Sequence, residues 1–276
     1  MGFLKNYKLC INYLKIGDNK MALLQKDIDY FNKRKNGIPQ FCSRFGIKII
    51  SKDEDASVLD LGCGDGNLSI AIALSGAKKV VGIDIDHQLI EFANENLITN
   101  YPELLNIVEF KDIDLRDYPN NGNFDYIVSR DSFEHIIDLE KVLCEMKNRL
   151  RLGGKIYVGF GPLYHSYNGG HVRMKNRFPW EHLIIPESIT IKRLNKQREN
   201  KIRSIQELGL NKWSLNDYKR LFKNSGLSII YFKVLGDPHP NKKIIEKIVN
   251  LMSKIPLLKE YFSQNIYCIL QKENIV

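Results

Sequence analysis

A glycine-rich loop, Asp60-Leu61-Gly62-Cys63-Gly64-Asp65-Gly66, lies between a predicted strand and a predicted helix. Glycines at such a turn let the backbone bend tightly and let a ligand approach the main chain. The spacing is G-x-G-x-G, whereas a loop that seats a dinucleotide pyrophosphate needs a glycine at position 67, where Asn67 stands. Asp60, two residues before the first glycine, would repel a pyrophosphate and suits a ligand that carries an ammonium group.

A second acid, Asp84, stands at the end of the next predicted strand, where a carboxylate can accept hydrogen bonds from both hydroxyls of a ribose. The loop and this acid together indicate a nucleoside with a cationic amino-acid tail as the ligand. We interpret Cys63 as a small residue packed beneath the loop and not as a nucleophile, because nothing in the sequence places a general base beside it.

Several motifs in this order resemble the class I S-adenosylmethionine-dependent methyltransferases, over about residues 56–160 and again in the closing helix-strand-helix-strand pattern. The resemblance implies S-adenosylmethionine as the cofactor. VLDLGCGDG is similar to the first motif of the family, GIDI to the second, and FDYIVSRDSFEHI to the motif of the fourth strand. The cofactor-binding residues that the resemblance implies are Asp60, Gly62, Cys63 and Gly64 at the methionine part, Asp84 at the ribose, Ile85, Asp112 and Ile113 at the adenine, and Ser129.

The elements that must position these residues alternate along the chain. Apolar runs at 58–62, 80–85, 106–110, 124–129 and 155–160 are predicted strands. Helices are predicted between the first two strands, from the cap Asp86 to about Thr99, and over 138–150, the last of which should stop at Gly153-Gly154. This alternation and the resemblance predict an α/β, three-layer Rossmann-like methyltransferase fold with a seven-stranded, mainly parallel sheet and an antiparallel last strand. We expect an N-terminal helical extension over 1–50 and a cofactor-binding domain over 51–276, which carries a cap insertion at about 161–213.

Acceptor choice should depend on the loop after the fourth strand. Methyltransferases of this family that act on exocyclic amino groups of bases commonly carry Asp or Asn followed by Pro-Pro and an aromatic residue there, and this chain has Ser129-Arg130-Asp131-Ser132-Phe133. Members of the family that methylate pyrimidines with a cysteine nucleophile carry a Pro-Cys dipeptide, and the sequence contains none. If the acceptor is a hydroxyl, a base would help, and His135, His165 and His171 are the candidates. We expect His135, His171 and Glu134 to be the catalytic group.

The segment from Asp131 to His135 also resembles the Glu-x-x-Glu-His of metal-dependent O-methyltransferases, in which a later histidine, here His171, completes a divalent-cation site. A cation that holds two acceptor oxygens would acidify a hydroxyl without a base. Asp131 replaces the first Glu of that pattern, so the ligand would be one methylene shorter. The other interpretation is that Glu134 and His135 simply order the loop.

The amino-acid composition excludes several classes of protein. The chain has 276 residues, of which 43% are hydrophobic and 26% charged, and these proportions exclude a disordered or disulfide-stapled chain. Its five scattered cysteines predict reduced thiols. Neither a secretion signal nor an apolar run long enough for a membrane span is apparent, so we expect a cytoplasmic protein, with contact to a membrane surface left open.

The net charge of +9 is concentrated between residues 171 and 203, where nine basic residues face three acids. Such a region favours anionic partners, namely phosphates, nucleic acid or acidic lipid, but it also fits a solvated face. We therefore expect a methyltransferase that acts on oxygen of a small-molecule, glycan or lipid-linked acceptor. The alternatives are an RNA ribose 2'-O-methyltransferase, a non-catalytic cofactor-binding module and, more weakly, an aminopropyl transferase.

Overall fold

The structure, a computed structural model, describes residues 25–35, 37–45, 55–120, 124–236 and 243–273. Contacts divide it into two compact units. The first comprises residues up to Arg130, Val142–Tyr157 and the chain from Ile269, and the second comprises Asp131–Lys141 and Val158–Cys268. The part of the predicted N-terminal extension that includes Met21 and Leu24 lies outside the described residues.

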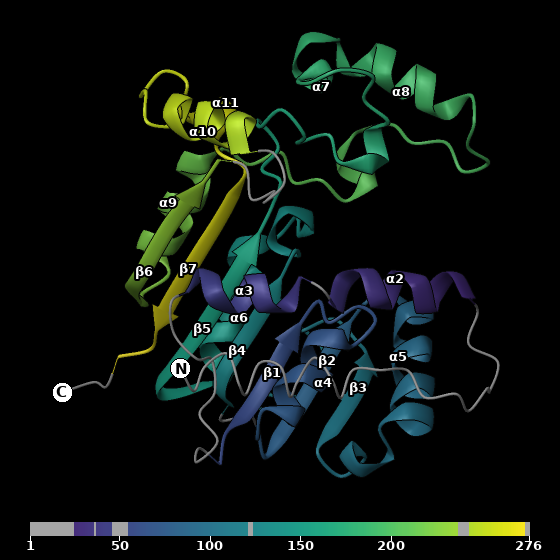
Figure 1. Cartoon of the computed structure of the whole chain (residues 1–276), viewed down its shortest axis with the longest axis vertical. Coiled ribbons are helices and arrows are strands. Elements are labelled where there is room, and N and C mark those ends of the chain that lie inside the picture. Colours follow the sequence, from purple (N-terminus) through teal and green to yellow (C-terminus); the bar gives the residue numbers. More distant parts are fainter. Residues whose placement is uncertain (1–24, 36, 46–54, 121–123, 237–242, 274–276) are drawn as a thin grey trace. The chain divides into compact units, whose positions relative to one another are not determined.

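Seven strands form one sheet in the order β3-β2-β1-β4-β5-β7-β6. The pairs β1 with β2, β1 with β4, and β2 with β3 are parallel. Figure 1 shows the arrow of β7 running opposite to those of its neighbours. The strands are β1 (Ser57–Leu61), β2 (Lys79–Asp84), β3 (Val108–Asp112), β4 (Phe124–Arg130), β5 (Leu150–Phe160), β6 (Ser228–Leu235) and β7 (Asn265–Gln271).

The central strands form because β-branched and leucine side chains can be buried on both faces of a parallel sheet. Val58, Val80 and Ile127 are fully buried in neighbouring strands of the first unit. In β1 the burial continues through Asp60 to Leu61, so the glycine loop starts from a rigid, buried strand. The register pairs Leu61 with Ile83, and this pairing brings the loop after β1 beside the end of β2.

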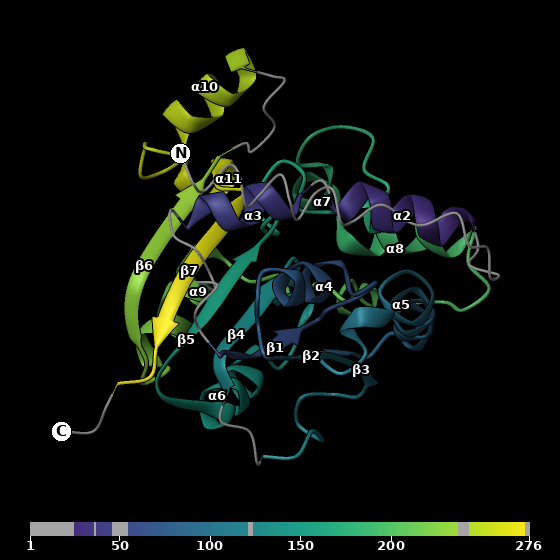
Figure 2. The ribbon, with the colours of Figure 1, turned by 60° about the horizontal axis from the view of Figure 1, so that its bottom comes forward.

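The helices of the first unit pack on these strands and on one another. Helix α5 begins as the sequence predicts, because the Asp86 side chain accepts hydrogen bonds from the N–H groups of Gln88 and Leu89. Helix α2 is held by Phe31, whose ring lies 5.9 Å from that of Phe92 on α5, and α2 lies nearly in line with α3 (Figure 1 and Figure 2). These elements are α2 (Gln25–Lys35), α3 (Ile38–Arg44), α4 (Asn67–Leu74), α5 (His87–Asn100) and the short 3₁₀ helix η1 (Pro102–Leu104).

The predicted stop of the helix before β5 is wrong in its position. Helix α6 (Leu139–Arg149) ends before Gly153, and β5 already starts at Leu150, so Gly153 and Gly154 lie inside the strand. Gly153 donates its N–H to the carbonyl of Lys272, and Gly154 accepts from the N–H of Lys272. Backbone pairing with the chain after β7 therefore extends β5 through two glycines, which from the local sequence alone were predicted to end the preceding helix.

Residues 161–213 were expected to form an ordered loop or cap, and they contain two helices that the sequence pattern did not predict. These residues enclose a small core of their own, which includes Tyr164, Met174 and Leu194. The buried carboxylate of Glu181 pairs with Arg177 and Arg193. His182 donates to the carbonyl of Tyr164 and accepts from Asn176. The elements are α7 (Glu181–Ile184), α8 (Glu187–Asn195), η3 (Val172–Met174) and η4 (Gln206–Leu208).

The remaining elements of the second unit follow the sequence pattern more closely. Helix α9 (Leu215–Asn224) begins at a capping box in which Ser214 and Asp217 exchange hydrogen bonds. The amphipathic helix α10 (Lys243–Met252) is present, and the short α11 (Lys259–Phe262) and η2 (Phe133–His135) were not predicted. No helix among the described residues combines the length and the apolar composition that crossing a bilayer requires. Cys42, Cys63, Cys144 and Cys268 are free thiols.

Candidate active site

The glycine loop after β1 is closed by hydrogen bonds to β2. Gly62 and Cys63 donate their N–H groups to the carbonyl of Ile83, at 2.9 and 3.1 Å. Gly62, Gly64 and Gly66 have φ values of 71°, 54° and 78°, in the left-handed region that favours glycine. A Cβ at Gly66 would lie 2.4 Å from the ring of Phe110. The loop therefore needs glycine both for its backbone conformation and for its packing on β3.

Asp84 lies directly against this loop. Its Oδ2 accepts the N–H of Gly64 at 2.8 Å, and its Oδ1 accepts the N–H of Asp86 at 3.0 Å. The side chain is half-buried, and each carboxylate oxygen has a second lone pair for another donor. The two hydroxyls of a ribose are donors of the kind that this carboxylate can accept, so the residue fits the ribose role that the resemblance implies.

Asp60 is placed differently from Asp84. Its side chain is 1% exposed, and its Oδ2 accepts a hydrogen bond of 2.6 Å from the hydroxyl of Ser69. Burial raises the pKa of Asp60 to about 6, against the hydrogen bond from Ser69 and the charges of Arg130 and Arg34. The carboxyl group is thus bound inside the first unit beneath the loop, where it supports the loop rather than facing solvent.

Arg34 is a residue at the loop that the sequence did not single out. It belongs to α2, and a Cβ built on Gly64 would lie 3.4 Å from its Nη1. Burial raises the pKa of Asp65, and the charge of Arg34 is the largest effect that opposes this rise. A guanidinium therefore lies at the loop, where the methionine carboxylate of the cofactor would need a cation. The packing of Phe31 on Phe92 carries the arginine there, and no local motif marks it.

Two other predicted cofactor residues, Ser129 in β4 and Cys63 in the loop, are buried. Ser129, at 1% exposed, donates its hydroxyl to the carbonyl of Leu61 at 3.0 Å and so ties β4 to β1. Cys63 is buried, and burial raises the pKa of its thiol well above the usual range, with the charges of Asp60 and Asp84 acting in the same direction. A thiol of this kind is a poor nucleophile, in keeping with the packing role that we expected.

The residues expected at the adenine lie at the ends of β2 and β3. Ile85 is 75% exposed, which is unusual for a large apolar side chain and leaves a face on which a base could stack. The N–H of Ile113 donates to the carbonyl of Asp84 at 3.0 Å, so the two strands are joined here. Asp112 accepts a hydrogen bond of 2.8 Å from Nδ1 of His87. The exposed side chain of Ile85 is suited to lie against the face of an adenine. Asp112 would bind the edge of the adenine while it also accepts the hydrogen bond from His87.

The second unit holds the predicted catalytic histidines side by side. The rings of His135 and His171 lie 5.0 Å apart, edge to face. Nδ1 of His135 donates to the carbonyl of Gly209 at 2.7 Å, and Nε2 of His171 donates to the carbonyl of Pro162 at 2.9 Å. Each carbonyl fixes one tautomer, in which Nδ1 of His135 and Nε2 of His171 carry the proton.

His171 is a neutral imidazole at physiological pH. Burial lowers its pKa to about 4, and the neighbouring His135 acts in the same direction. Its backbone φ of 52° lies in the left-handed region, which is uncommon for a residue other than glycine. The basic form of His171 is therefore present throughout the physiological range, but a pKa this far below neutral makes the imidazole a weak proton acceptor.

Glu134 lies in the interior of the second unit. Its Oε1 accepts the N–H of Gly161 at 3.0 Å, whereas its buried Oε2 has no hydrogen-bond partner. Burial raises the pKa of Glu134 to about 8, with the charge of Asp131 acting in the same direction. The side chain of Glu134 is therefore mostly a neutral carboxylic acid at pH 7. Its hydrogen bond with Gly161 joins the loop after β4 to the chain after β5.

The described residues contain no group of three His, Cys, Asp or Glu side chains that could hold a metal ion. Asp131, Glu134, His135 and His171 thus do not assemble into the cation site that the Glu-x-x-Glu-His resemblance suggested. His165, the third candidate base, donates from Nδ1 to Oε1 of Glu260 at 2.7 Å. This hydrogen bond is separate from those of His135 and His171.

The comparisons with known proteins agree with this geometry. A model of the methyltransferase domain family matches residues 52–209, which is more than half of the chain. The chain therefore belongs to the methyltransferase domain family, and its fold is that of the class I S-adenosylmethionine-dependent enzymes. The fold class and S-adenosylmethionine as the cofactor, both expected from the resemblance, are confirmed.

The matches with individual relatives extend over only part of each protein. Phosphoethanolamine N-methyltransferase 3 of Arabidopsis thaliana is 28% identical over 168 residues, which are 55% of this chain and 33% of that protein. The ribosomal protein L11 methyltransferase of Pelobacter propionicus is 39% identical over 102 residues, which are 37% of this chain and 31% of that protein. This chain thus spans about one third of the length of the curated relatives that it matches.

A solved structure supports the fold. Phosphoethanolamine N-methyltransferase 2 of Haemonchus contortus, in complex with S-adenosyl-L-methionine, aligns with a TM-score of 0.54 at 17% identity. The alignment covers 87% of this chain and 53% of that one. At this identity the likeness establishes the architecture and leaves the acceptor to be argued from the residues of this chain.

Proposed function

We propose that this chain is a cytosolic enzyme that transfers a methyl group from S-adenosylmethionine to an oxygen of a small-molecule, glycan or lipid-linked acceptor. The observation that carries the proposal is the pair His135 and His171, whose rings lie 5.0 Å apart and whose tautomers are fixed by backbone carbonyls. A hydroxyl must lose its proton as it is methylated, and a neutral imidazole is a suitable acceptor for that proton.

When bound, the cofactor supplies an electrophilic methyl group on a sulfonium, so the protein mainly has to bind and orient the reactants. Asp84 would accept the ribose hydroxyls, and Ile85 would lie against the adenine. The open backbone at Gly64 and the guanidinium of Arg34 would receive the methionine part. Orientation of this kind accounts for roughly 7 to 11 kcal/mol of a barrier, which is more than a base contributes.

Within the second unit, His171 would act as the base, and His135, whose ring lies 5.0 Å from it, would orient it. Because Nε2 of His171 already donates to Pro162, the proton would arrive at Nδ1. Glu134 would act as a positioning residue, since its Oε1 holds the N–H of Gly161. Only four residues, Asp131 to Glu134, separate the end of β4 from His135 along the chain.

A nitrogen acceptor is the second candidate. It is favoured by the similarity to phosphoethanolamine N-methyltransferase 3, and a neutral amine can attack the methyl group before it loses a proton. The RNA alternative draws less support, because much of the basic segment is used inside the cap. Basic side chains that bond to other cap residues are Arg173, Lys175, Arg177, Arg193 and Lys201.

The test is incubation of the purified chain with methyl-labelled S-adenosylmethionine and separate small-molecule, lipid, glycan and RNA fractions. Label in an acceptor as an ether or ester supports transfer to oxygen, and label in a methylated amine supports the second candidate. Tight cofactor binding with no labelled product from any fraction would overturn both and favour a non-catalytic binding module. Label that appears only in RNA would overturn the acceptor class.

A further inference from the structure

Helix α10 and the turn after it leave a strip of large apolar side chains exposed. We call Ile248, Leu251, Ile255 and Leu257 the α10 strip; their exposed fractions are 54%, 63%, 41% and 87%. Val249, on another side of the same helix, is 6% exposed. The helix therefore packs on the second unit through one apolar side and presents a second apolar side to solvent, where large exposed patches usually mark an interaction site.

Ile248 and Leu251 are three residues apart on α10 and so share one side of the helix, and Ile255 and Leu257 follow in the turn after Met252. Two exposed lysines lie next to the strip along the chain, Lys247 on the helix and Lys254 in the turn. Asn250 fixes the helix at the end of β6, since its Oδ1 accepts the N–H of Gly236; Figure 2 shows α10 beyond the end of that strand. The strip is thus held by a folded element.

Its surroundings are basic. Between residues 242 and 259 the sequence has five lysines (Lys242, Lys243, Lys247, Lys254, Lys259) and one acid, Glu246, which gives a net +4. The next acid, Glu260, is engaged by His165 and by the N–H of Leu215. An apolar strip whose border carries one sign of charge favours a partner that is both apolar and anionic.

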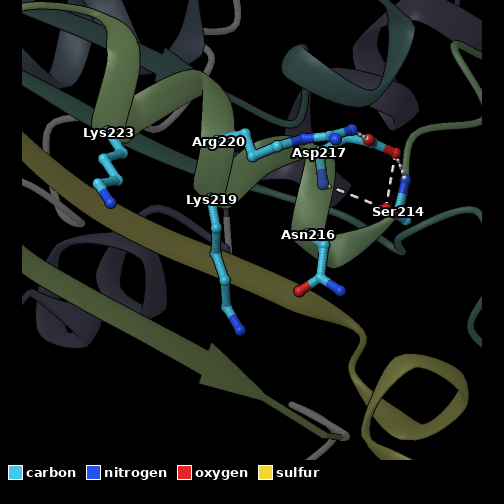
Figure 3. A pocket seen from close by; sticks show the side chains of 6 residues that line it. All are labelled: Ser214, Asn216, Asp217, Lys219, Arg220 and Lys223. Carbon is cyan, nitrogen blue, oxygen red and sulfur yellow. Dashed lines mark hydrogen bonds and ion pairs between the residues drawn. The ribbon is translucent and has the colours of Figure 1, made fainter.

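The basic surface continues onto α9. A pocket there is lined by Ser214, Asn216, Asp217, Lys219, Arg220 and Lys223. Figure 3 shows Lys219 and Lys223 extending from the helix on one side, whereas Arg220 turns toward Asp217. The N–H of Leu215, at the start of α9, donates to Glu260, the neighbour of Lys259 on α11. Burial lowers the pKa of Lys219, and the charge of Lys259 acts in the same direction. The lysines of α9 and of α11 therefore belong to one surface.

We propose that the α10 strip and its lysines dock this protein on the surface of an anionic lipid bilayer. The strip would enter the boundary between headgroups and acyl chains, and Lys247, Lys254 and Lys259 would lie at the headgroup phosphates. Amphipathic helices with apolar side chains on one side and lysines beside them bind membranes in this way, and each lysine near an anionic surface adds to the attraction.

Two other occupants fit less well. A second copy of this chain would bring Lys247 and Lys254 against their own equivalents across a two-fold axis, where like charges repel. A nucleic acid would pair with the lysines but would leave Leu251 and Leu257 in water. A bilayer satisfies both halves of the surface, and this docking would hold whether or not the proposed transfer to oxygen is correct.

The test is co-sedimentation of the full chain with phosphatidylcholine vesicles, with and without about a third of phosphatidylglycerol. We expect binding only to the anionic vesicles, with affinity that falls as salt is added. Leu251→Glu with Leu257→Glu, and separately Lys247→Glu with Lys254→Glu, should each lower the partition coefficient at least about tenfold. All four positions are exposed, so both variants should keep the parent melting temperature.

Matched controls lie on the cap. Ile184→Glu replaces an equally exposed isoleucine on α7, and Lys192→Glu reverses an exposed lysine on α8; both should bind the anionic vesicles as the parent does. Equal binding to neutral vesicles, no binding to either, or unchanged binding of the two strip variants would overturn the proposal. A doubled solution mass that Leu251→Glu reduces to that of a monomer would assign the strip to a second copy instead.

Discussion

The backbone N–H of Gly64 donates a hydrogen bond of 2.8 Å to Oδ2 of Asp84. The glycine loop after β1 and the acid at the end of β2 are therefore directly coupled, although they are 20 positions apart along the chain. Since Asp84 also accepts from Asp86, a single carboxylate positions the loop, the start of α5 and the proposed ribose site. A change at Asp84 should consequently act on the loop and on the ligand together.

Asp84→Ala should raise the dissociation constant of S-adenosylhomocysteine, the demethylated cofactor, at least about 100-fold. The variant loses two charged hydrogen bonds to the ribose, each worth about 1.5 to 3 kcal/mol, and also the anchor of Gly64. Calorimetric titration measures the change. Asp138→Ala, which removes an exposed acid that pairs with Lys141, is the control and should bind as the parent does. Parent affinity in Asp84→Ala would remove this residue from the ribose site.

Arg34→Ala should weaken S-adenosylhomocysteine about tenfold, because a charge-assisted hydrogen bond to the methionine carboxylate is lost. The same variant should bind methylthioadenosine, which has no amino-acid tail, as tightly as the parent does. Lys33→Ala removes an exposed neighbouring cation and should change neither affinity. If Arg34→Ala weakens both ligands equally, the residue stabilises the loop and does not recognise the carboxylate.

The difference between Asp84 and Arg34 indicates what the sequence can predict. The loop, Asp84 and the helix cap Asp86 are set by neighbours close along the chain, so type and spacing were sufficient to find them. Arg34 reaches the loop through the packing of α2 on α5, which no local pattern encodes. Ser129, which we expect at the cofactor, donates its hydroxyl to the carbonyl of Leu61 across the sheet, and this contact depends on the strand register, which the sequence does not give.

Elements defined by long-range pairing were also the ones that the sequence misplaced. Gly153 and Gly154 have the composition of a helix stop, yet their backbone pairs with Lys272, more than a hundred residues later. The helices of the cap are short, and they are stabilised by tertiary contacts such as the buried Glu181 with Arg193 rather than by a long amphipathic pattern. Pairing and burial of this kind become visible only in three dimensions.

His171→Asn should lower turnover by about 10²- to 10⁴-fold and leave cofactor affinity unchanged, because a base acts on the acceptor and not on the cofactor. Asparagine tolerates the left-handed backbone at this position, so the fold should be retained. His165→Asn is the matched control and should keep parent turnover, since His165 is engaged by Glu260. The rate is measured with the labelled acceptor fraction.

The pH profile gives an independent check on His171. Its pKa of about 4 means that the basic form is present throughout the neutral range, so its titration should cause no loss of rate between pH 8 and about pH 5. A fall in rate centred near the ordinary histidine pKa that disappears in His171→Asn would show that the imidazole titrates normally. That result would contradict the neutral, buried state described above.

Glu134→Gln should change how stability depends on pH. The folded-state pKa of Glu134 is raised to about 8 by burial, so its contribution is fully present below the unfolded pKa and is lost as pH rises through about 8. Between about pH 7 and about pH 9 the parent should lose on the order of 1 kcal/mol of unfolding free energy more than the variant. Glutamine retains an oxygen for the N–H of Gly161, so Glu134→Gln separates the proton from the hydrogen bond. Urea unfolding at both pH values measures the difference, and parallel losses in the two proteins would show that Glu134 is already ionised in the folded state.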